Sequence, residues 1–565
     1  MSLDEKPGGA EEVVLARSVR SHNRRLTKLI VAVVAILALG GLAGVLSFIA
    51  HAAPAPLWGT LDTQPGNAAA EYKAGVKMVM FEFNWASFEP QSGVLSASYL
   101  ATMKSYMSSF QAAGQQVTLG LGLQNPPSWV FSLPGSRYVD QNGDTSTEAN
   151  FVFSQAVRTA AAGYLALVAK NLPLSAFWAI RLTSGGDGEM LYPGSGTYWA
   201  FDTAALTGNG LAAGMTRNPD PSWKPGTGGL TQSQIDAWSS WYIGGLDNVT
   251  NWQMTTLASL GYTGYYETVT PGSGTRPDYL AQEEQNNLND QSTTGVGAVW
   301  DRYYAQLPNK NKVIAYISSV ADNSGGNSAC QSSDISVSLT SNTMDSWSAT
   351  RWISRIARQN GLLVGGENPG YGLPASLNSF YTNTSSTGMM ATALNLARTC
   401  GFTVFYWAHD IHLWDGTIPF TLYAASIAPA APANLVLTGT VTASNTLSGF
   451  SASAANDASQ DTYWQAAGST ATLTLHLAQA APVAMITLEL PQGWGTRNQT
   501  IQVDGSTNGS TWTTLAPSAA YQFTAGTNTI AIPVPTATQA YLRLDISGNN
   551  VQGAPQIAEF QAYSS

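Results

Sequence analysis

The stretch KMVMFEFNWASFEPQSG, residues 77–93, carries the pattern on which the fold prediction depends. It opens with a short apolar run, Lys77–Phe83, of the kind expected for a strand that is buried on both faces. Polar and aromatic residues, beginning with Asn84 and Trp85, follow at once. A buried strand that ends in such a loop is typical of a parallel barrel, which carries its chemistry at the carboxyl ends of its strands.

The same pattern recurs through residues 54–427, where short apolar runs alternate with helical patterns. The clearest helical pattern places Leu100, Met103, Met107 and Phe110 on one face and stops at Gly114. Eight such alternations predict a (β/α)8 barrel, also called a TIM barrel. A doubly wound sheet is the alternative, but no glycine-rich phosphate loop follows the first strand. The predicted strands are Leu57–Leu61, Lys77–Phe83, Gln116–Leu123, Ala176–Leu182, Tyr262–Val269, Lys312–Ser318, Leu362–Gly366 and Phe402–Trp407.

Composition limits the function classes. Only 11% of the 565 residues are charged, against an average of about 25%. The 25 basic and 35 acidic residues give a net charge of −10, which argues against a nucleic-acid partner. A surface covered mainly by neutral polar residues is common on extracellular proteins that handle neutral polymers.

The N-terminus reads as a targeting segment. Residues 1–28 form a basic segment, and Leu29–Ala50 gives 22 residues without a charge. This length is enough for a transmembrane helix whose basic flank stays in the cytoplasm. The alternative is the apolar region of a signal peptide cleaved near Ala50-His51-Ala52. Both readings place the rest of the chain outside the cytoplasm, either held at the cell membrane or secreted.

A Pro/Ala linker at residues 428–433 separates the barrel region from a second region, 434–565, in which only strand and turn patterns occur. The two cysteines, Cys330 and Cys400, lie in the barrel region. Outside the cytoplasm they can form a disulfide, and two separate buried thiols are the alternative.

Two glutamates follow predicted strands four and seven: Glu189 and Glu367. Because barrel sites lie at the carboxyl ends of the strands, we expect both at the same mouth. Glycoside hydrolysis needs two carboxyl groups beside the scissile bond, one protonated and one ionised. A solvated loop acid is the alternative for either one alone.

The loops at this mouth also carry aromatic, amide and charged side chains suited to sugar rings and hydroxyls. No cofactor is expected for catalysis. The predicted substrate-binding residues are Asn84, Trp85, Gln124, Asn125, Trp129, Arg181, Tyr192, Tyr266, Asn368, Trp407, His409 and Asp410.

These loops resemble known glycosidases. Residues 83–93 and the Pro126-Pro127-Ser128-Trp129 stretch are similar to glycoside hydrolase family 42, the β-galactosidases. Gly188-Glu189 followed by Tyr192-Pro193 looks more like β-amylase. The resemblance implies that Glu189 is the acid/base and Glu367 the nucleophile. One departure is Gly188, because the family 42 clan usually has there an Asn that binds the sugar 2-hydroxyl.

Residues 434–565 resemble the discoidin, or coagulation factor 5/8 type C, domain, which is carbohydrate-binding module family 32. The matching stretches are residues 441–444, 455–464, 506–512 and 557–560. The resemblance implies an all-β sandwich with a structural calcium held by Asp457, Thr462 and Glu559. A metal-free sandwich is the alternative. Trp494, Arg497 and Asn550 are the predicted sugar-binding residues of this domain.

The sequence therefore predicts an extracytoplasmic glycoside hydrolase that acts on an oligo- or polysaccharide and carries a carbohydrate-binding module. The preferred reaction is retaining hydrolysis of a β-glycoside, as in a β-galactosidase. An inverting, β-amylase-like hydrolase is the alternative within enzymes. A glycan-binding surface protein without activity is the alternative outside them, and the uncleaved N-terminal helix would attach either one to the membrane.

Overall fold

The computed structural model describes residues 55–194, 196–289, 293–322, 328–372, 375–428 and 434–564. The chain divides into two compact units between Ala428 and Pro429, at the start of the predicted linker. The predicted N-terminal segments, 1–28 and 29–50, and linker residues 429–433 lie outside the described residues. Within the described part of the chain, no helix is both long and apolar enough to cross a membrane.

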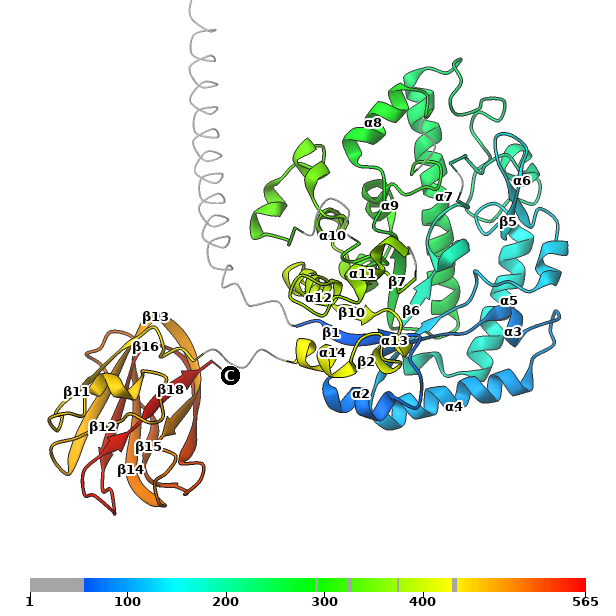
Figure 1. The fold of residues 1–565 in the computed structure, drawn as a ribbon. Helices are drawn as coiled ribbons and strands as arrows, with labels where there is room; N and C mark the ends of the chain where they lie inside the picture. Colours follow the sequence, from blue (N-terminus) through cyan, green and yellow to red (C-terminus); the bar gives the residue numbers. More distant parts are fainter. Residues whose placement is uncertain are drawn as a thin grey trace, which may run out of the picture. The chain divides into compact units, whose positions relative to one another are not determined.

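The first unit is built on a closed barrel of eight parallel strands (Figure 1). All eight strands lie where the apolar runs predict them, and the order around the barrel is β1-β10-β9-β8-β7-β6-β3-β2. The strands are β1 (Leu57–Leu61), β2 (Met78–Glu82), β3 (Gln116–Gly120), β6 (Phe177–Leu182), β7 (Tyr265–Thr270), β8 (Val313–Ile317), β9 (Leu363–Glu367) and β10 (Val404–Trp407).

Helices surround this barrel. In α4 the predicted apolar face is buried through Met103, Met107 and Phe110, and the left-handed Gly114, at φ 93°, ends the helix. The longest helix, α7, covers 28 residues and begins with a capping box at Thr231. The helices are α2 (Ala68–Ala74), α3 (Trp85–Phe88), α4 (Ala97–Ala113), α5 (Gln155–Asn171), α6 (Thr203–Thr207), α7 (Gln232–Ser259), α8 (Pro277–Gln285), α9 (Trp300–Gln306), α10 (Ala349–Gln359), α11 (Asn378–Tyr381), α12 (Met389–Thr399), α13 (Ile411–Trp414) and α14 (Phe420–Ile427).

Two cores result from the alternation of side chains along the strands. Side chains that point outward pack against the helices in one large core. Side chains that point inward, including Met80, Ile314 and Val404, form a separate core inside the barrel. The barrel interior is therefore filled by side chains and forms no open channel.

A short hairpin of β4 (Arg137–Val139) and β5 (Thr145–Ala149) interrupts the connection between β3 and α5. The sequence pattern did not predict this hairpin. Its strands have three and five residues, too short to show a clear alternation.

The second unit is all-β, with its own buried core around Trp464, Leu488 and Phe560. Its main sheet has the order β11-β13-β16-β14-β15, with β18 beside β13. The long strands β13 and β16 pair with each other through two irregular points, between His476 and Ala481 and between Val483 and Met485. The strands are β11 (Thr440–Ala443), β12 (Trp464–Gln465), β13 (Thr470–Glu489), β14 (Arg497–Ser506), β15 (Thr513–Phe523), β16 (Thr529–Ser547), β17 (Gln556–Ile557) and β18 (Glu559–Tyr563).

Cys330 and Cys400 form a disulfide across 70 residues of sequence. It joins the loop after β8 to the end of α12, and Cys400 is fully buried. The sequence left open a disulfide or two separate thiols, and the structure contains the disulfide.

We expect the double variant Cys330→Ser, Cys400→Ala to unfold more easily than the parent. A loop of 70 residues closed in the unfolded chain corresponds to about 4 kcal/mol of stabilisation in the chain-entropy model. Urea denaturation followed by near-ultraviolet circular dichroism measures the loss. Equal unfolding midpoints for parent and variant would contradict the expectation, and the parent in reductant is the control.

Candidate functional site

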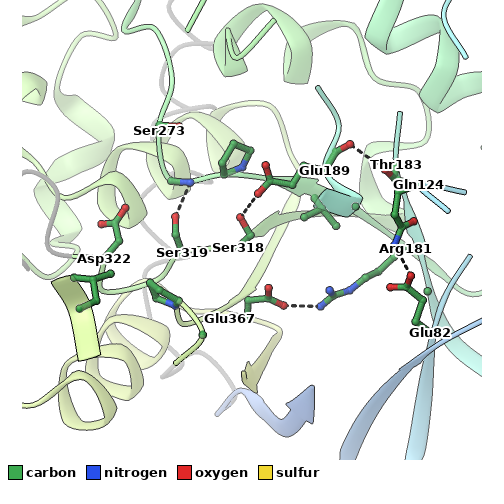
Figure 2. A pocket seen from close by; sticks show the side chains of 18 of the residues that line it. Glu82, Gln124, Arg181, Thr183, Glu189, Ser273, Ser318, Ser319, Asp322 and Glu367 are labelled. Carbon is green, nitrogen blue, oxygen red and sulfur yellow. Dashed lines mark hydrogen bonds and ion pairs between the residues drawn. The ribbon is translucent and has the colours of Figure 1, made fainter. Parts of the chain in front are cut away.

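A cavity of about 530 Å³ opens at the carboxyl ends of the barrel strands (Figure 2). Its volume falls within the range of about 300–1,000 Å³ usual for small-molecule sites. Side chains from the ends of six strands or the loops after them line it: Glu82, Gln124, Arg181, Glu189, Val269, Ser318 and Glu367. The predicted acids Glu189 and Glu367 thus lie in one cavity.

Glu189 follows β6 after a tight turn, Gly186–Gly188, that ends with Gly188 in the left-handed region at φ 75°. Its side chain points into the cavity, where Oε1 accepts a hydrogen bond of 2.6 Å from the Ser318 hydroxyl (Figure 2). Ser318 follows β8, so the bond joins the loops after the two strands that flank β7 and gives the carboxyl a fixed direction.

The hairpin β4–β5 holds the turn before Glu189. The Glu148 carboxylate accepts a hydrogen bond of 2.8 Å from the Gly186 amide. A Cβ at Gly186 would lie 2.6 Å from Glu148 Oε1, so the approach needs a glycine. Gly185 and Gly186, at the start of the turn, therefore make room for a protein carboxylate.

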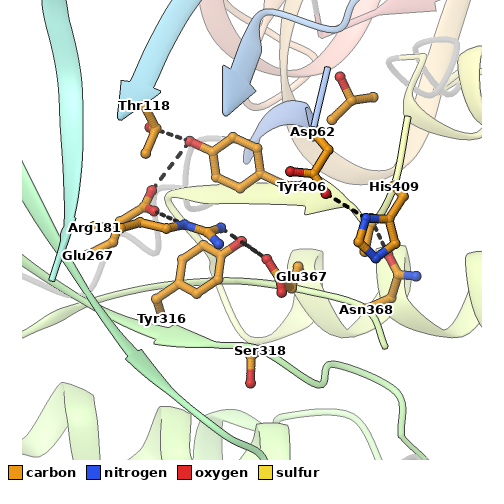
Figure 3. A network of polar contacts seen from close by, with 12 residues as sticks. Asp62, Thr118, Arg181, Glu267, Tyr316, Ser318, Glu367, Asn368, Tyr406 and His409 are labelled. Carbon is orange, nitrogen blue, oxygen red and sulfur yellow. Dashed lines mark hydrogen bonds and ion pairs between the residues drawn. The ribbon is translucent and has the colours of Figure 1, made fainter. Parts of the chain in front are cut away.

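Glu367 is the last residue of β9. Its Oε2 accepts hydrogen bonds from Arg181 Nη2 at 3.0 Å and from the Tyr316 hydroxyl at 2.6 Å (Figure 3). A guanidinium and a phenol on the same oxygen hold this carboxyl group in one orientation.

A third carboxyl, Glu267 on β7, lies deeper in the barrel (Figure 3). Arg181 Nε pairs with it at 3.1 Å, and the Tyr406 hydroxyl is 3.3 Å away. Thr118 is 2.6 Å from the same hydroxyl. Burial raises the pKa of Glu267 to about 7, although Arg181 opposes this rise. Arg181 is therefore shared between an inner acid that titrates near neutrality and the cavity acid Glu367.

Glu82 is a further carboxyl of the cavity wall. It accepts hydrogen bonds from the amides of Gln124 and Asn125. Burial raises the pKa of Glu82, and Asp62 adds to the rise. Of the two predicted amides, Gln124 lines the cavity and Asn125 is exposed beside it.

His409 flanks the cavity. Its Nδ1 is 2.7 Å from Asp62, and this contact raises the pKa of His409. A Cβ on Gly370, which lines the cavity, would be 2.6 Å from His409 Nε2. The ring thus stands directly behind the cavity wall.

Two predicted substrate-binding residues point the wrong way along their strands. Tyr266 is buried in the outer core and donates to the Met254 carbonyl of α7. Trp407 is fully buried against Tyr381. The residues beside them, Glu267 and Tyr406, are the ones that face the barrel interior, because adjacent side chains of a strand alternate.

Three others stabilise the loops instead of lining the cavity. Asn84 caps α3 by accepting from the Ser87 amide. Trp85 is buried, donates to Glu89 and stacks on a neighbouring tyrosine. Tyr192 is buried and stacks on Tyr242 with ring centroids 4.0 Å apart.

The remaining three predictions for the rim are also corrected. Asn368 is buried, and its side chain bridges Pro369 and the Ala408 amide. Asp410 is buried and bonds to the Gln64 amide. Trp129 lines a different groove beside α5. Amide and acid side chains next to strand ends are as suited to closing loops as to binding sugar.

Several residues of the site do not follow from the sequence pattern. Ser318, Ser319 and Asp322 line the cavity after β8, and Tyr316 and Glu267 lie beneath it. The signal that was available is the alternation along each strand. Glu267 is an acid inside an apolar run, which is unusual unless it has a partner.

In the second unit, Asp457, Thr462 and Glu559 do come together. The Thr462 hydroxyl donates to Asp457 at 2.7 Å, and the Ser459 amide donates to both carboxylates at 3.0 Å. Glu559 Oε2 is buried without a hydrogen-bond partner among the described residues. Burial and the nearby Asp457 raise the pKa of Glu559 to about 7.

Two carboxylates that face each other with an unsatisfied oxygen fit a hard cation such as Ca²⁺. In the described part of the chain, no group of three or more His, Cys, Asp and Glu residues forms a metal cluster. A cation at Asp457 and Glu559 would therefore need Thr462 or backbone oxygens as further ligands.

The predicted sugar-binding residues of this unit are partly engaged. The Arg497 guanidinium is buried, lies 4.1 Å from the Trp494 ring centre and donates to Gln556. Trp494 also packs edge-on against Tyr463. Asn550 is exposed, and its side chain accepts from the Asn498 amide. The Arg497 guanidinium thus packs on one face of the Trp494 ring.

Residues 440–560 match the F5/8 type C domain family model, so the second unit is an F5/8 type C domain. No match was found among curated proteins. Among solved structures, the chain is similar to the family 32 carbohydrate-binding module of NanJ from C. perfringens in complex with galactose, with 16% identity and a TM-score of 0.21. That match covers 23% of this chain and 97% of the other.

Another similar structure is chitosan-binding module 1 of a chitosanase/glucanase from Paenibacillus sp. IK-5, at 26% identity. It has a TM-score of 0.20, and the match covers 23% of this chain and 98% of that one.

We expect Glu267 to make the stability of the barrel depend on pH. Its pKa is about 7 in the folded chain and about 4.3 unfolded, so the folded state binds one more proton between these values. The free energy of unfolding should therefore fall as pH rises from about 4.3 to about 7. In Glu267→Gln, which cannot titrate, this part of the slope should vanish in melting curves recorded from pH 4 to pH 8.

The control is Asp236→Asn on α7, which removes a carboxylate whose hydrogen bond to Gln232 is exposed to solvent. This variant should keep the parental slope. Parallel curves for the parent and Glu267→Gln would contradict the assignment.

Proposed function

We propose that this chain is an extracytoplasmic glycoside hydrolase, and that its reaction is retaining hydrolysis of a β-glycoside. The observation that carries the proposal is the pair Glu189 and Glu367, which extend from the ends of the fourth and seventh barrel strands into one cavity. The β-galactosidase-like loop after the second strand supports the same reaction. The F5/8 type C domain would bind the glycan, and the N-terminal segment would hold the protein at the membrane or direct its secretion.

In this mechanism Glu367 attacks the anomeric carbon as a carboxylate. Arg181 and Tyr316 hold it in one orientation for this attack. Glu189, held by Ser318, gives its proton to the glycosidic oxygen as the bond to the leaving group breaks. Glu189 then takes a proton from water, which attacks the glycosyl–Glu367 ester and releases the sugar.

The inverting alternative uses the same two residues with a water between them. Retaining enzymes hold their carboxyls about 5–5.5 Å apart and inverting enzymes about 6.5–9.5 Å. We expect the shorter distance here. A non-catalytic glycan-binding protein is the second candidate, because Gly188 replaces the Asn that binds the sugar 2-hydroxyl in the family 42 clan.

Glu189→Gln and Glu367→Gln should each keep the fold and lower hydrolysis at least about 10²-fold, the smaller end of what a general acid contributes. The measurement is turnover on a panel of chromogenic glycosides, with Asp236→Asn as a carboxylate-removal control outside the cavity. Near-parental turnover in either glutamine variant would remove that residue from the mechanism.

The first-formed anomer, followed by proton NMR on the best substrate, separates the two enzymatic mechanisms. Retention of the anomeric configuration supports Glu367 as nucleophile, and inversion assigns it as a general base. No turnover by the parent on any substrate of the panel favours the non-catalytic candidate.

We also propose that Asp457, Thr462 and Glu559 hold a structural calcium. Removing the ion should lower the melting temperature of the 434–565 fragment, since a ligand that binds only the folded state stabilises it. Melting curves with calcium and with excess chelator measure the shift, and Glu559→Gln should reduce it. Coincident curves, with no calcium found by elemental analysis, would refute the site.

A further inference from the structure

A second cavity, of about 400 Å³, lies on the outside of the helix ring. Its walls come from the middle of α7, the end of α9 and the loop at residues 214–216. It has no lining residue in common with the barrel cavity. The proposed hydrolysis therefore gives this cavity no role.

An aromatic ring of fixed orientation forms one wall. Trp241 is half-buried, and its Nε1 donates to the Thr216 carbonyl at 2.9 Å. The ring also stacks on Phe153, with centroids 5.7 Å apart and planes 27° apart. A ring held at its edge and against a second ring offers a rigid apolar surface to a ligand at little entropic cost.

The cavity also contains an acceptor that the described residues leave unsatisfied. Asp247 is buried, and neither of its carboxylate oxygens has a hydrogen-bond partner within the described part of the chain. Leaving a buried acceptor without a donor is unfavourable, so a ligand hydroxyl at Asp247 would be stabilised.

The other polar lining groups are neutral: Thr216, Ser240, Asn248, Asn251 and Gln306. The buried Arg158 donates to the Asn248 side chain at 2.6 Å and orients it. Among the described residues no lysine or arginine lines the cavity, so its walls offer no cationic group to an anionic ligand.

Gly244 leaves part of this space open. It is a helical glycine, and a Cβ there would meet only Gln306 Oε1, at 3.7 Å. A larger side chain at this position would therefore enter the cavity without straining the backbone of α7.

We propose that this cavity is a second saccharide-binding site, in which a neutral sugar lies on Trp241 and donates a hydroxyl to Asp247. A rigid aromatic wall, neutral amides and an unsatisfied acceptor are the groups that a hydroxyl-rich ring with one apolar face requires. The site would hold a neutral polysaccharide outside the barrel, whether or not Glu189 and Glu367 are catalytic.

The test is hydrogen–deuterium exchange of the full chain in the Glu189→Gln background, with and without polysaccharide. The probes are soluble β-1,4-galactan, starch and xylan, with polygalacturonate as an anionic probe and chitosan as a cationic one. Peptides that cover residues 240–251 report on this cavity separately from the barrel mouth and the C-terminal domain.

We expect at least one neutral polysaccharide to slow exchange at residues 240–251. In Trp241→Ala and Gly244→Leu, the polysaccharide concentration needed for this effect should rise about tenfold or more. Asp247→Asn should weaken the effect as well, because the best acceptor is lost. Ser233→Leu, at an exposed position of α7 that does not line the cavity, is the control and should behave as the parent.

Protection that persists in both Trp241→Ala and Gly244→Leu would overturn the proposal. Protection by chitosan alone would overturn it in favour of an amine site. The absence of protection by every neutral polysaccharide would overturn it too. Hydrolysis is not part of the readout, so failure of this site and failure of the proposed enzyme activity give different results.

Discussion

One guanidinium enclosed by two carboxylates governs the mouth of the barrel. Arg181 reaches Glu267 at 3.1 Å below and Glu367 at 3.0 Å above, and the Tyr316 ring lies 4.1 Å from its centre. Removing three charged groups from water is expensive, and only their mutual pairing offsets that cost. The phenol of Tyr406 and the hydroxyl of Thr118 complete the network with neutral partners. The cavity acid is therefore anchored from inside the barrel.

The apolar layer beneath this network makes the arrangement possible. Inward side chains such as Met80 and Ile314 close the barrel from below, and they exclude water from Glu267. The same exclusion strengthens every charge contact above it. The buried apolar layer and the ion pairs of Arg181 thus depend on each other. The apolar layer excludes water, and the charge contacts above it are stronger for that reason.

The fold was largely predictable from the sequence, because eight apolar runs between helical patterns allow few architectures. The F5/8 type C domain was predictable from its motifs. The positions of Glu189 and Glu367 also followed from the strand ends. The rest of the site did not follow, because a sequence shows which residues adjoin a strand end and not which way they point. Tyr266 and Trp407 are the clearest cases, since each is one residue away from an inward-facing neighbour, Glu267 and Tyr406. Asn84 is satisfied by a local hydrogen bond from the Ser87 amide, and Asp410 by a long-range one from the Gln64 amide, so both side chains stabilise loops.

The contact between Glu148 and the Gly186 amide shows that the loop carrying Glu189 is not self-contained. Its shape depends on a hairpin inserted between an earlier strand and its helix. The loop after β6 therefore cannot be transferred to another barrel by itself and keep its shape. A chimera that imports this loop into another barrel would import the acid without its support, whereas a segment from β3 through β6 would carry both. The two segments must therefore change together. A substitution in the hairpin that removes the Glu148 contact would alter the position of Glu189.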